Sequence, residues 1–193
     1  MRNRVAADGG AEGGVEGELM QQQLETGTQP CTTTDDLRAE LRRWRERADG
    51  HAREVDCRIA ALATSPVPTV PRTTLDDRYH AIAEEFGITQ AEQLACGMHV
   101  HVSTESDEEG VAVIDRVRPW LSVLDDGLIY FDVRLSRLYP TVELRVAYVC
   151  PRLEVTATIA ALGRALVERA AADWRRTRPG CRRARHGRGD GGG

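Results

Sequence analysis

The sequence predicts an α+β domain, and three observations support this class. Apolar residues recur every three or four positions over residues 37–62, 111–124 and 153–174, which is typical of amphipathic helices. Apolar and polar residues alternate over 96–102, 128–135 and 141–146, which predicts strands. Only Ser136 to Pro140 separate the last two strands, so we expect an antiparallel hairpin there. Helices interspersed with adjacent antiparallel strands indicate an α+β fold.

The first half of the chain contains one clear helix. Residues 1–13 are rich in Gly and Ala and are expected to form a disordered lead-in, followed by a strand at 14–20 and a turn at 25–30. Thr33 or Thr34 can cap the helix at 37–62, and Asp35 and Asp36 suit its first turn because the helix dipole favours anions there. The proline-rich stretch 64–71 is expected to be an extended loop.

The second half adds three helices around the strands. A short helix is expected at 75–86, where Gly87 ends it. Ser106 can cap a helix that runs towards Leu124, with Pro119 expected to kink or interrupt it. A last helix is expected at 153–174, and the Arg- and Gly-rich tail 175–193 is expected to be disordered. One domain would then span residues 14–174.

Charge and composition exclude several classes of function. The net charge is −4, but the tail from residue 175 carries seven Arg and one Asp, which leaves about −10 on the rest. An acidic folded part disfavours binding to nucleic acid. All 26 basic residues are Arg, so a catalytic lysine is excluded. Five cysteines without C-x-x-C spacing argue against a disulfide framework. No apolar run is long enough for a membrane span. We therefore expect a cytoplasmic protein.

Three predicted strands each carry a pair of chemically active residues on one face. Residues at i and i+2 of a strand share a face, so the pairs are Glu16 with Glu18, His99 with His101, and Glu143 with Arg145. If the strands lie in one sheet with these faces turned together, they line a site of carboxylates, imidazoles and a guanidinium. That combination suits a divalent cation and a phosphate.

Structural interpretations of the same pairs stay open. Glu16 and Glu18 could form a solvated strand face, and Glu143 and Arg145 could simply pair across the hairpin. For His99 and His101, spacing alone makes a structural role and a functional role about equally plausible. A functional role gains support because two imidazoles on an apolar strand are costly to bury without partners. Arg134 could reach a carboxylate or phosphate, or it could pair with Glu143 on the neighbouring strand.

The chemistry that follows from these groups is phosphoryl transfer. Carboxylates and a histidine would hold Mg²⁺, which bridges the phosphates of ATP, and Arg145 would neutralise charge on the transferring phosphoryl group. A substrate carboxylate would become an acyl phosphate, and an amine would then displace phosphate to give an amide. A competing interpretation is a His-x-His hydrolase, which would use Zn²⁺ and no ATP.

Three segments together resemble the bacterial glutamate-cysteine ligase type 2 family, also called carboxylate-amine ligases. They are GVEGEL from Gly14, CGMHVHV from Cys96 with DRVRPWLSVL from Asp115, and YFDVRLSRLYPTVELRV from Tyr130. The resemblance implies a glutamine-synthetase-like fold, with helices packed on one face of an antiparallel sheet. It also implies ATP- and Mg²⁺-dependent ligation of the glutamate γ-carboxylate to cysteine or another amine. Its motifs assign Glu16, Glu18, His99 and Glu143 as metal ligands, with His101 as a further candidate.

The same resemblance implies catalytic roles for Arg145 and Arg134, with Arg145 contacting the ATP phosphates. The chain departs from the family pattern in three places. Gly17 stands where the family has an acidic residue, and segments appear to be missing after Pro30 and after Leu124. The fold would then be incomplete, and activity would be weak. A catalytically inactive remnant that binds nucleotide, metal or a partner is the alternative, and a homo-oligomer is also compatible with the sequence.

Overall fold

The structure, a computed structural model, describes residues 15–17, 20–72, 74, 94–121 and 133–178. Contacts within the chain group it into two compact units. Unit 1 comprises residues 1–97 and 148–158, and unit 2 comprises residues 98–147 and 159–193. Each unit is described by itself below. The expectation of a single domain over residues 14–174 stays a prediction.

Helix α2 (Thr34–Arg53) is the main element of unit 1. Thr33 is its N-cap, and the Thr33 hydroxyl accepts a hydrogen bond from the backbone N–H of Asp36, which confirms the expected cap. The helix buries Trp44, Ala48 and Ala52. It ends nine residues before the predicted limit at Leu62, because residue 56 adopts a positive φ of 56° and the chain leaves the helical path there.

The first strand of unit 1 pairs with a strand that the sequence analysis missed. β1 (Val15–Gly17) and β2 (Leu24–Thr26) run antiparallel, with Glu16 opposite Glu25. Residues 25 and 26 therefore belong to a strand and not to the turn predicted at 25–30. The two strands form a two-stranded sheet, whereas the His strand lies in another sheet. The sequence analysis expected the strands that carry Glu16, His99 and Glu143 to lie in one sheet. Within the described residues this expectation is wrong for the strand that carries Glu16.

Arg45 of α2 ties the beginning of the last helix to unit 1. Its guanidinium donates hydrogen bonds to the carbonyl oxygens of Cys150 and Pro151 and to the hydroxyl of Thr156. These acceptors surround the start of α6 (Leu153–Thr177), where the chain enters the helix. Three bonds from one guanidinium fix the path of this segment, and charged donors make them stronger than neutral hydrogen bonds.

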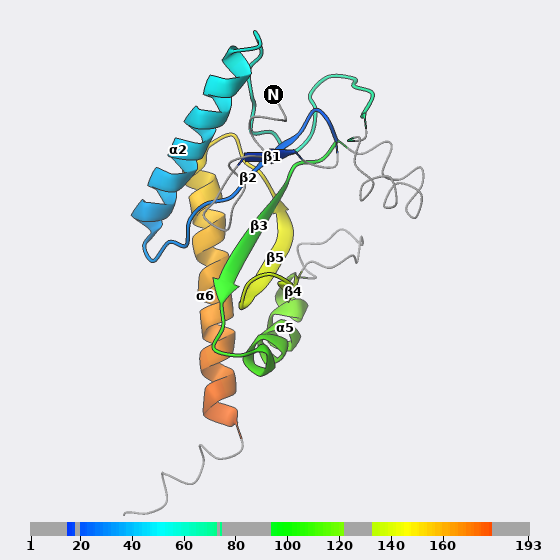
Figure 1. The fold of residues 1–193 in the computed structure, drawn as a ribbon. Coiled ribbons are helices and arrows are strands. Elements are labelled where there is room, and N and C mark those ends of the chain that lie inside the picture. Colours follow the sequence, from blue (N-terminus) through cyan, green and yellow to red (C-terminus); the bar gives the residue numbers. More distant parts are fainter. Residues whose placement is uncertain (1–14, 18–19, 73, 75–93, 122–132, 179–193) are drawn as a thin grey trace, which may run out of the picture. The chain divides into compact units, whose positions relative to one another are not determined.

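A three-stranded sheet forms the centre of unit 2, in the order β3-β5-β4. β3 (Gly97–Ser103) lies beside β5 (Thr141–Tyr148) and runs antiparallel to it (Figure 1). β4 (Val133–Leu135) pairs antiparallel with β5, with Arg134 opposite Glu143. The predicted hairpin and the predicted His strand are thereby confirmed. Residues 128–132 of the strand predicted at 128–135 lie outside the described residues, as does the helix expected at 75–86.

The apolar face of this sheet packs against α5 (Asp107–Leu121) and α6. The buried core contains residues from all three strands and from both helices: Val102, Val133, Val142, Leu144, Val113, Val117, Leu121, Val167, Ala170 and Ala171. This arrangement confirms the α+β class, with helices on one face of an antiparallel sheet. Because side chains alternate along each strand, the opposite face is left for polar residues.

The two helices of unit 2 differ slightly from their predicted extents. α5 continues through Pro119 for two residues and ends at Leu121, the last described residue before 133. α6 continues to Thr177, so Arg175 is helical and not part of a tail as predicted. Arg175 donates a hydrogen bond of 2.6 Å to Glu109, which is fully buried at the start of α5. None of the described helices combines the length and apolar character needed to cross a membrane.

Candidate active site

Five of the sequence-predicted site residues lie on the polar face of the sheet in unit 2. His99 and His101 come from β3, Arg134 from β4, and Glu143 and Arg145 from β5. Alternation along the strands places them together, since their sequence neighbours on β3 and β5 face the core on the other side. A site of one carboxylate, two guanidinium groups and two imidazoles is thus built on paired strands and not on loops.

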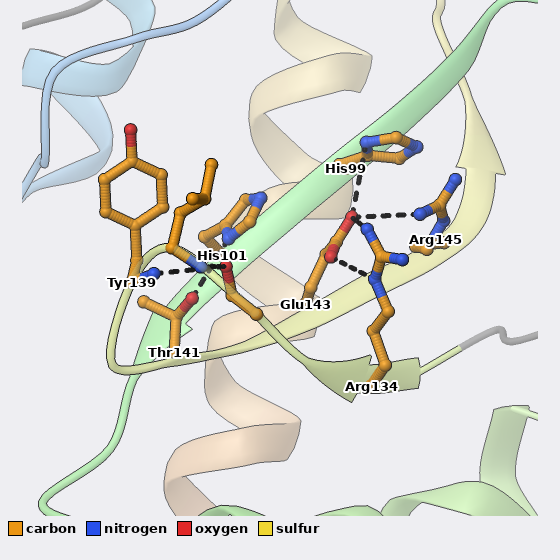
Figure 2. A network of polar contacts seen from close by, with 9 residues as sticks. His99, His101, Arg134, Tyr139, Thr141, Glu143 and Arg145 are labelled. Atoms are coloured by element: carbon orange, nitrogen blue, oxygen red, sulfur yellow. Dashed lines mark hydrogen bonds and ion pairs between the residues drawn. The ribbon is translucent and has the colours of Figure 1, made fainter. Parts of the chain in front are cut away.

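Glu143 is the centre of the arrangement, and Figure 2 shows three side chains converging on it. Its Oε2 accepts a hydrogen bond of 2.5 Å from Nε of Arg134, and its Oε1 lies 3.2 Å from Nη2 of the same guanidinium. Nη1 of Arg145 and Nδ1 of His99 each lie 3.4 Å from Oε1. The pairing of Arg134 with Glu143, which the sequence left as one of two alternatives, is therefore present.

The two oxygens of Glu143 differ in how tightly they are held. Oε2 makes the short bond to Arg134, whereas the contacts of Oε1 with Arg134, Arg145 and His99 measure 3.2–3.4 Å. Since a strong charge-assisted hydrogen bond measures about 2.7–2.9 Å, Oε1 is the oxygen that can more readily change partners. A cation or a donor on a ligand would approach Glu143 at this atom.

The surroundings keep Glu143 ionised although it is 2% exposed. Burial alone would raise the pKa of this carboxyl, but the hydrogen bond from Arg134 and the charges of Arg134, Arg145 and His99 together hold the pKa below its ordinary value. A buried carboxylate in this position orients both guanidinium groups. Two guanidinium charges against one carboxylate leave an excess positive charge, and both Arg side chains are partly exposed. This face can therefore bind an anion.

His101 of β3 forms a second group on the same face, beside Thr141 at the beginning of β5 (Figure 2). Its Nδ1 lies 3.0 Å from the hydroxyl of Thr141, and its ring meets that of Tyr139 edge to face at 6.0 Å between centroids. Burial lowers the pKa of His101, and the charges of Arg134 and Arg145 lower it further, while Glu143 opposes them. His101 is therefore neutral at pH 7 and can accept or donate a hydrogen bond.

Sequence reasoning missed Thr141 and Tyr139. Thr141 had a usable signal, since it lies two residues before Glu143 and so shares its face of β5. Tyr139 lies in the turn between β4 and β5, where no periodicity places a side chain. The structure adds both residues to the site through their contacts with His101.

The two remaining predicted ligands are Glu16 and Glu18. Glu16 lies in β1 of unit 1, and Glu18 lies outside the described residues. Among the described residues there is no group of three or more His, Cys, Asp or Glu side chains placed to hold a metal ion. His99 and Glu143 are the two potential ligands that the structure does bring together. The assignment of Glu16 and Glu18 as metal ligands stays a prediction.

Comparison with known proteins agrees with this sheet. The sequence model of glutamate-cysteine ligase family 2 matches residues 3–125 and 123–186, which together make up most of the chain. The matched ranges contain the five site residues on the polar face of the sheet in unit 2. The chain belongs to glutamate-cysteine ligase family 2. The match breaks at residues 123–125, directly after α5. No solved structure matches the chain.

Curated relatives carry the same family name. The chain is 42% identical to "Putative glutamate--cysteine ligase 2-1" of Streptomyces avermitilis, over 83% of this chain and 60% of the relative. It is 40% identical to "Putative glutamate--cysteine ligase 2" of Streptomyces coelicolor, over 89% of this chain and 63% of the relative. The chain thus spans about three fifths of the length of these relatives.

These alignments also contain many positions at which this chain has no residue. The alignment with the S. avermitilis protein has 217 positions but uses 83% of this chain, or about 160 residues, so about 57 positions have no residue of this chain. The S. coelicolor alignment, with 229 positions and 89% of this chain, gives the same figure. The relatives therefore carry about 57 residues, inside the aligned region, that this chain lacks.

Proposed function

We propose that the chain is an ATP-dependent carboxylate-amine ligase of the glutamate-cysteine type, acting on small molecules in the cytoplasm. The observation that carries the proposal is the cluster of Arg134, Arg145 and His99 around the buried carboxylate of Glu143, in a chain of this family. The fixed guanidinium groups offer an anion site on a rigid sheet, which is what transfer of a phosphoryl group requires.

In the proposed reaction, an oxygen of the glutamate γ-carboxylate attacks the γ-phosphorus of ATP, and ADP leaves. The amine of cysteine then attacks the acyl carbon, an amide bond forms, and phosphate leaves with the carboxylate oxygen. Arg145 and Arg134 bind the phosphoryl oxygens and neutralise the charge that develops on them. Glu143 holds both guanidinium groups in place, and no nucleophile from the protein is needed.

Mg²⁺ would accompany ATP, and two side chains fit it. Nδ1 of His99 and Oε1 of Glu143 lie 3.4 Å apart, which allows both to bind one ion whose ligand distances are about 2.1 Å. Mg²⁺ commonly uses one or two protein ligands and completes its shell with water and phosphate oxygens, so two donors suffice. When bound, the ion would withdraw charge from the phosphates of ATP.

The test is phosphate release from ATP in the presence of Mg²⁺, glutamate and cysteine, with each amino acid omitted in turn. We expect release that needs both amino acids and that falls about 100-fold or more in Glu143→Gln, which keeps the shape of the side chain but removes its charge. Glu168→Gln on α6 is the matched control, because this carboxylate is exposed and forms its ion pair with Arg164 of the same helix. Thermal unfolding would verify that both variants fold.

A second candidate is a catalytically inactive family member that binds nucleotide or metal. The absence of about 57 aligned positions from this chain favours it, since residues that line a substrate pocket in the relatives could be among them. This candidate predicts binding of ATP with Mg²⁺, measured by calorimetry and weakened in Glu143→Gln, together with no release of phosphate above that of the variant.

A further inference from the structure

The turn between β4 and β5 presents two large apolar side chains to solvent. Leu138 is 83% exposed and Tyr139 is 47% exposed. Both lie in unit 2 beside the polar face of the sheet, since the ring of Tyr139 contacts that of His101 on β3. The proposed phosphoryl transfer gives neither side chain a role. A single exposed apolar residue needs no explanation, whereas an adjacent pair beside a polar site is a candidate for contact with a ligand.

Hydrogen bonds hold this turn in one conformation. The hydroxyl of Ser136 accepts hydrogen bonds from the backbone N–H groups of Leu138 and Tyr139, each at 3.3 Å. The backbone N–H of Thr141 donates to the carbonyl of Tyr139 at 2.8 Å, and that of Ser136 donates to the carbonyl of Thr141 at 3.0 Å. A ligand that binds here does not have to order the turn, which lowers the entropic cost of binding.

The two rings offer flat faces to a planar ligand. The rings of His101 and Tyr139 are nearly perpendicular, with an angle of 86° between their planes and 6.0 Å between their centroids. In such an edge-to-face pair, at least one face of each ring lies outside the contact. Aromatic side chains stack on nucleobases because every base has a π-face. The half-exposed ring of Tyr139 is therefore suited to stack on a base.

The position of Tyr139 relative to the two guanidinium groups suits a nucleotide. His101 lies two residues beyond His99 on β3, which is about 7 Å at a rise of about 3.4 Å per residue. Tyr139 lies on the side of His101 that is away from Arg145 (Figure 2). In ATP the ribose and two further phosphates separate the γ-phosphoryl group from the base, so the base must bind at a distance from the group that is transferred. A nucleotide whose phosphates bind Arg134 and Arg145 can thus extend along the sheet to this turn.

We infer that Tyr139 binds the adenine base of ATP by stacking, with His101 and Leu138 completing the contact around the base. The inference rests on the proposed function, because it takes ATP as the substrate, and it adds a site for the base to the site for the phosphates. The turn then selects a nucleotide over an inorganic polyphosphate, which binds only through its charge.

Binding of ATP and of inorganic tripolyphosphate, each with Mg²⁺, would be measured by calorimetry on the full chain without glutamate or cysteine. Tripolyphosphate offers the same chain of phosphates and lacks the base. We expect Tyr139→Ala to raise the dissociation constant of ATP about tenfold or more and to leave that of tripolyphosphate unchanged. Arg145→Met should weaken the binding of both ligands. Tyr139→Trp keeps an aromatic face and should bind ATP as the unchanged chain does.

Tyr148→Ala is the matched control, because this tyrosine is 55% exposed and lies at the other end of β5. We expect it to bind both ligands as the unchanged chain does. Equal weakening of ATP and tripolyphosphate binding in Tyr139→Ala would overturn the inference. So would an unchanged affinity for ATP in that variant, even if the chain is an active ligase, or an unchanged chain that binds no ATP. Binding of ATP through Tyr139 without release of phosphate in the ligase assay would refute the proposed reaction and leave the inference intact.

Discussion

Replacing Arg175 with Met should weaken the attachment of α6 to α5. Arg175 donates a 2.6 Å hydrogen bond to Oε1 of Glu109, whose side chain is fully buried. The other oxygen of this carboxylate accepts a hydrogen bond from the backbone N–H of residue 105, also at 2.6 Å. Met keeps most of the apolar stem of Arg175 and removes the charge, so the variant isolates the loss of the ion pair.

The expected loss of unfolding free energy is about 2 kcal/mol. A hydrogen bond to a charged group contributes about 1.5–3 kcal/mol, and leaving a buried charge unpaired can cost more. We take the lower part of this range because Arg175 is about half exposed and the backbone bond to Glu109 remains. For a chain of this size the change corresponds to about 4–8 °C in the unfolding temperature.

The pH dependence follows from the carboxylate. Burial would raise the pKa of Glu109, but the hydrogen bonds from Arg175 and residue 105 hold it below its ordinary value. A carboxyl whose pKa is lowered on folding contributes stability above its unfolded pKa of about 4.3, and this stability is lost as the pH falls through the folded pKa. The difference between the unchanged chain and Arg175→Met should thus be largest near pH 7 and shrink below about pH 4.

Urea unfolding followed by circular dichroism at several pH values would measure this difference. Arg169→Met is the control, because its ion pair with Asp173 lies on the exposed side of α6 and should contribute less than about 1 kcal/mol. A double-mutant cycle with Glu109→Gln would isolate the pairwise energy. Equal losses in Arg175→Met and Arg169→Met, or a difference that does not change with pH, would refute the reasoning.

Three further results are expected. Arg45→Met should lower the free energy of unfolding, measured in urea, by about 1–3 kcal/mol, because the carbonyls before α6 and the Thr156 hydroxyl lose a charged donor. An unchanged free energy of unfolding would contradict the role given to Arg45. The NMR titration midpoint of His101 should lie below 6.5 and fall further in Glu143→Gln, because the carboxylate opposes the lowering; a rise would show that another group controls it. Gly163→Ala should lower the unfolding temperature, as its Cβ would meet a β5 leucine at 2.8 Å, whereas a gain would mean that α6 shifts freely.

The sequence predicted the elements whose local signals are strong and uninterrupted. The capping threonine at residue 33, the alternation through β3 and β5, and the periodicity of α6 each agree with the structure. Periodicity failed where it continued past a break: Val55 and Ile59 extended the apolar stripe of α2, but residue 56 turns the chain out of the helix. β2 was missed because three residues are too few to show alternation.

The site was partly predictable for a related reason. Alternation alone places Glu143 and Arg145 on one face, and the hairpin brings Arg134 opposite Glu143. The position of β1 depends on pairing between distant parts of the chain, which no local pattern encodes, and β1 pairs with β2 and not with the sheet that contains His99. The contact between His101 and the turn residue Tyr139 likewise depends on how the hairpin closes.

Transfer of oxygen from glutamate to phosphate tests the central claim most directly. The chain would be incubated with ATP, Mg²⁺, cysteine and glutamate labelled with ¹⁸O in its γ-carboxylate, and the phosphate released would be analysed by mass spectrometry. Activation of the carboxylate as an acyl phosphate requires one ¹⁸O atom in each phosphate, and Glu143→Gln should abolish the signal. Released phosphate without ¹⁸O would mean that water attacks ATP, and the proposal that this cluster activates a carboxylate would be wrong.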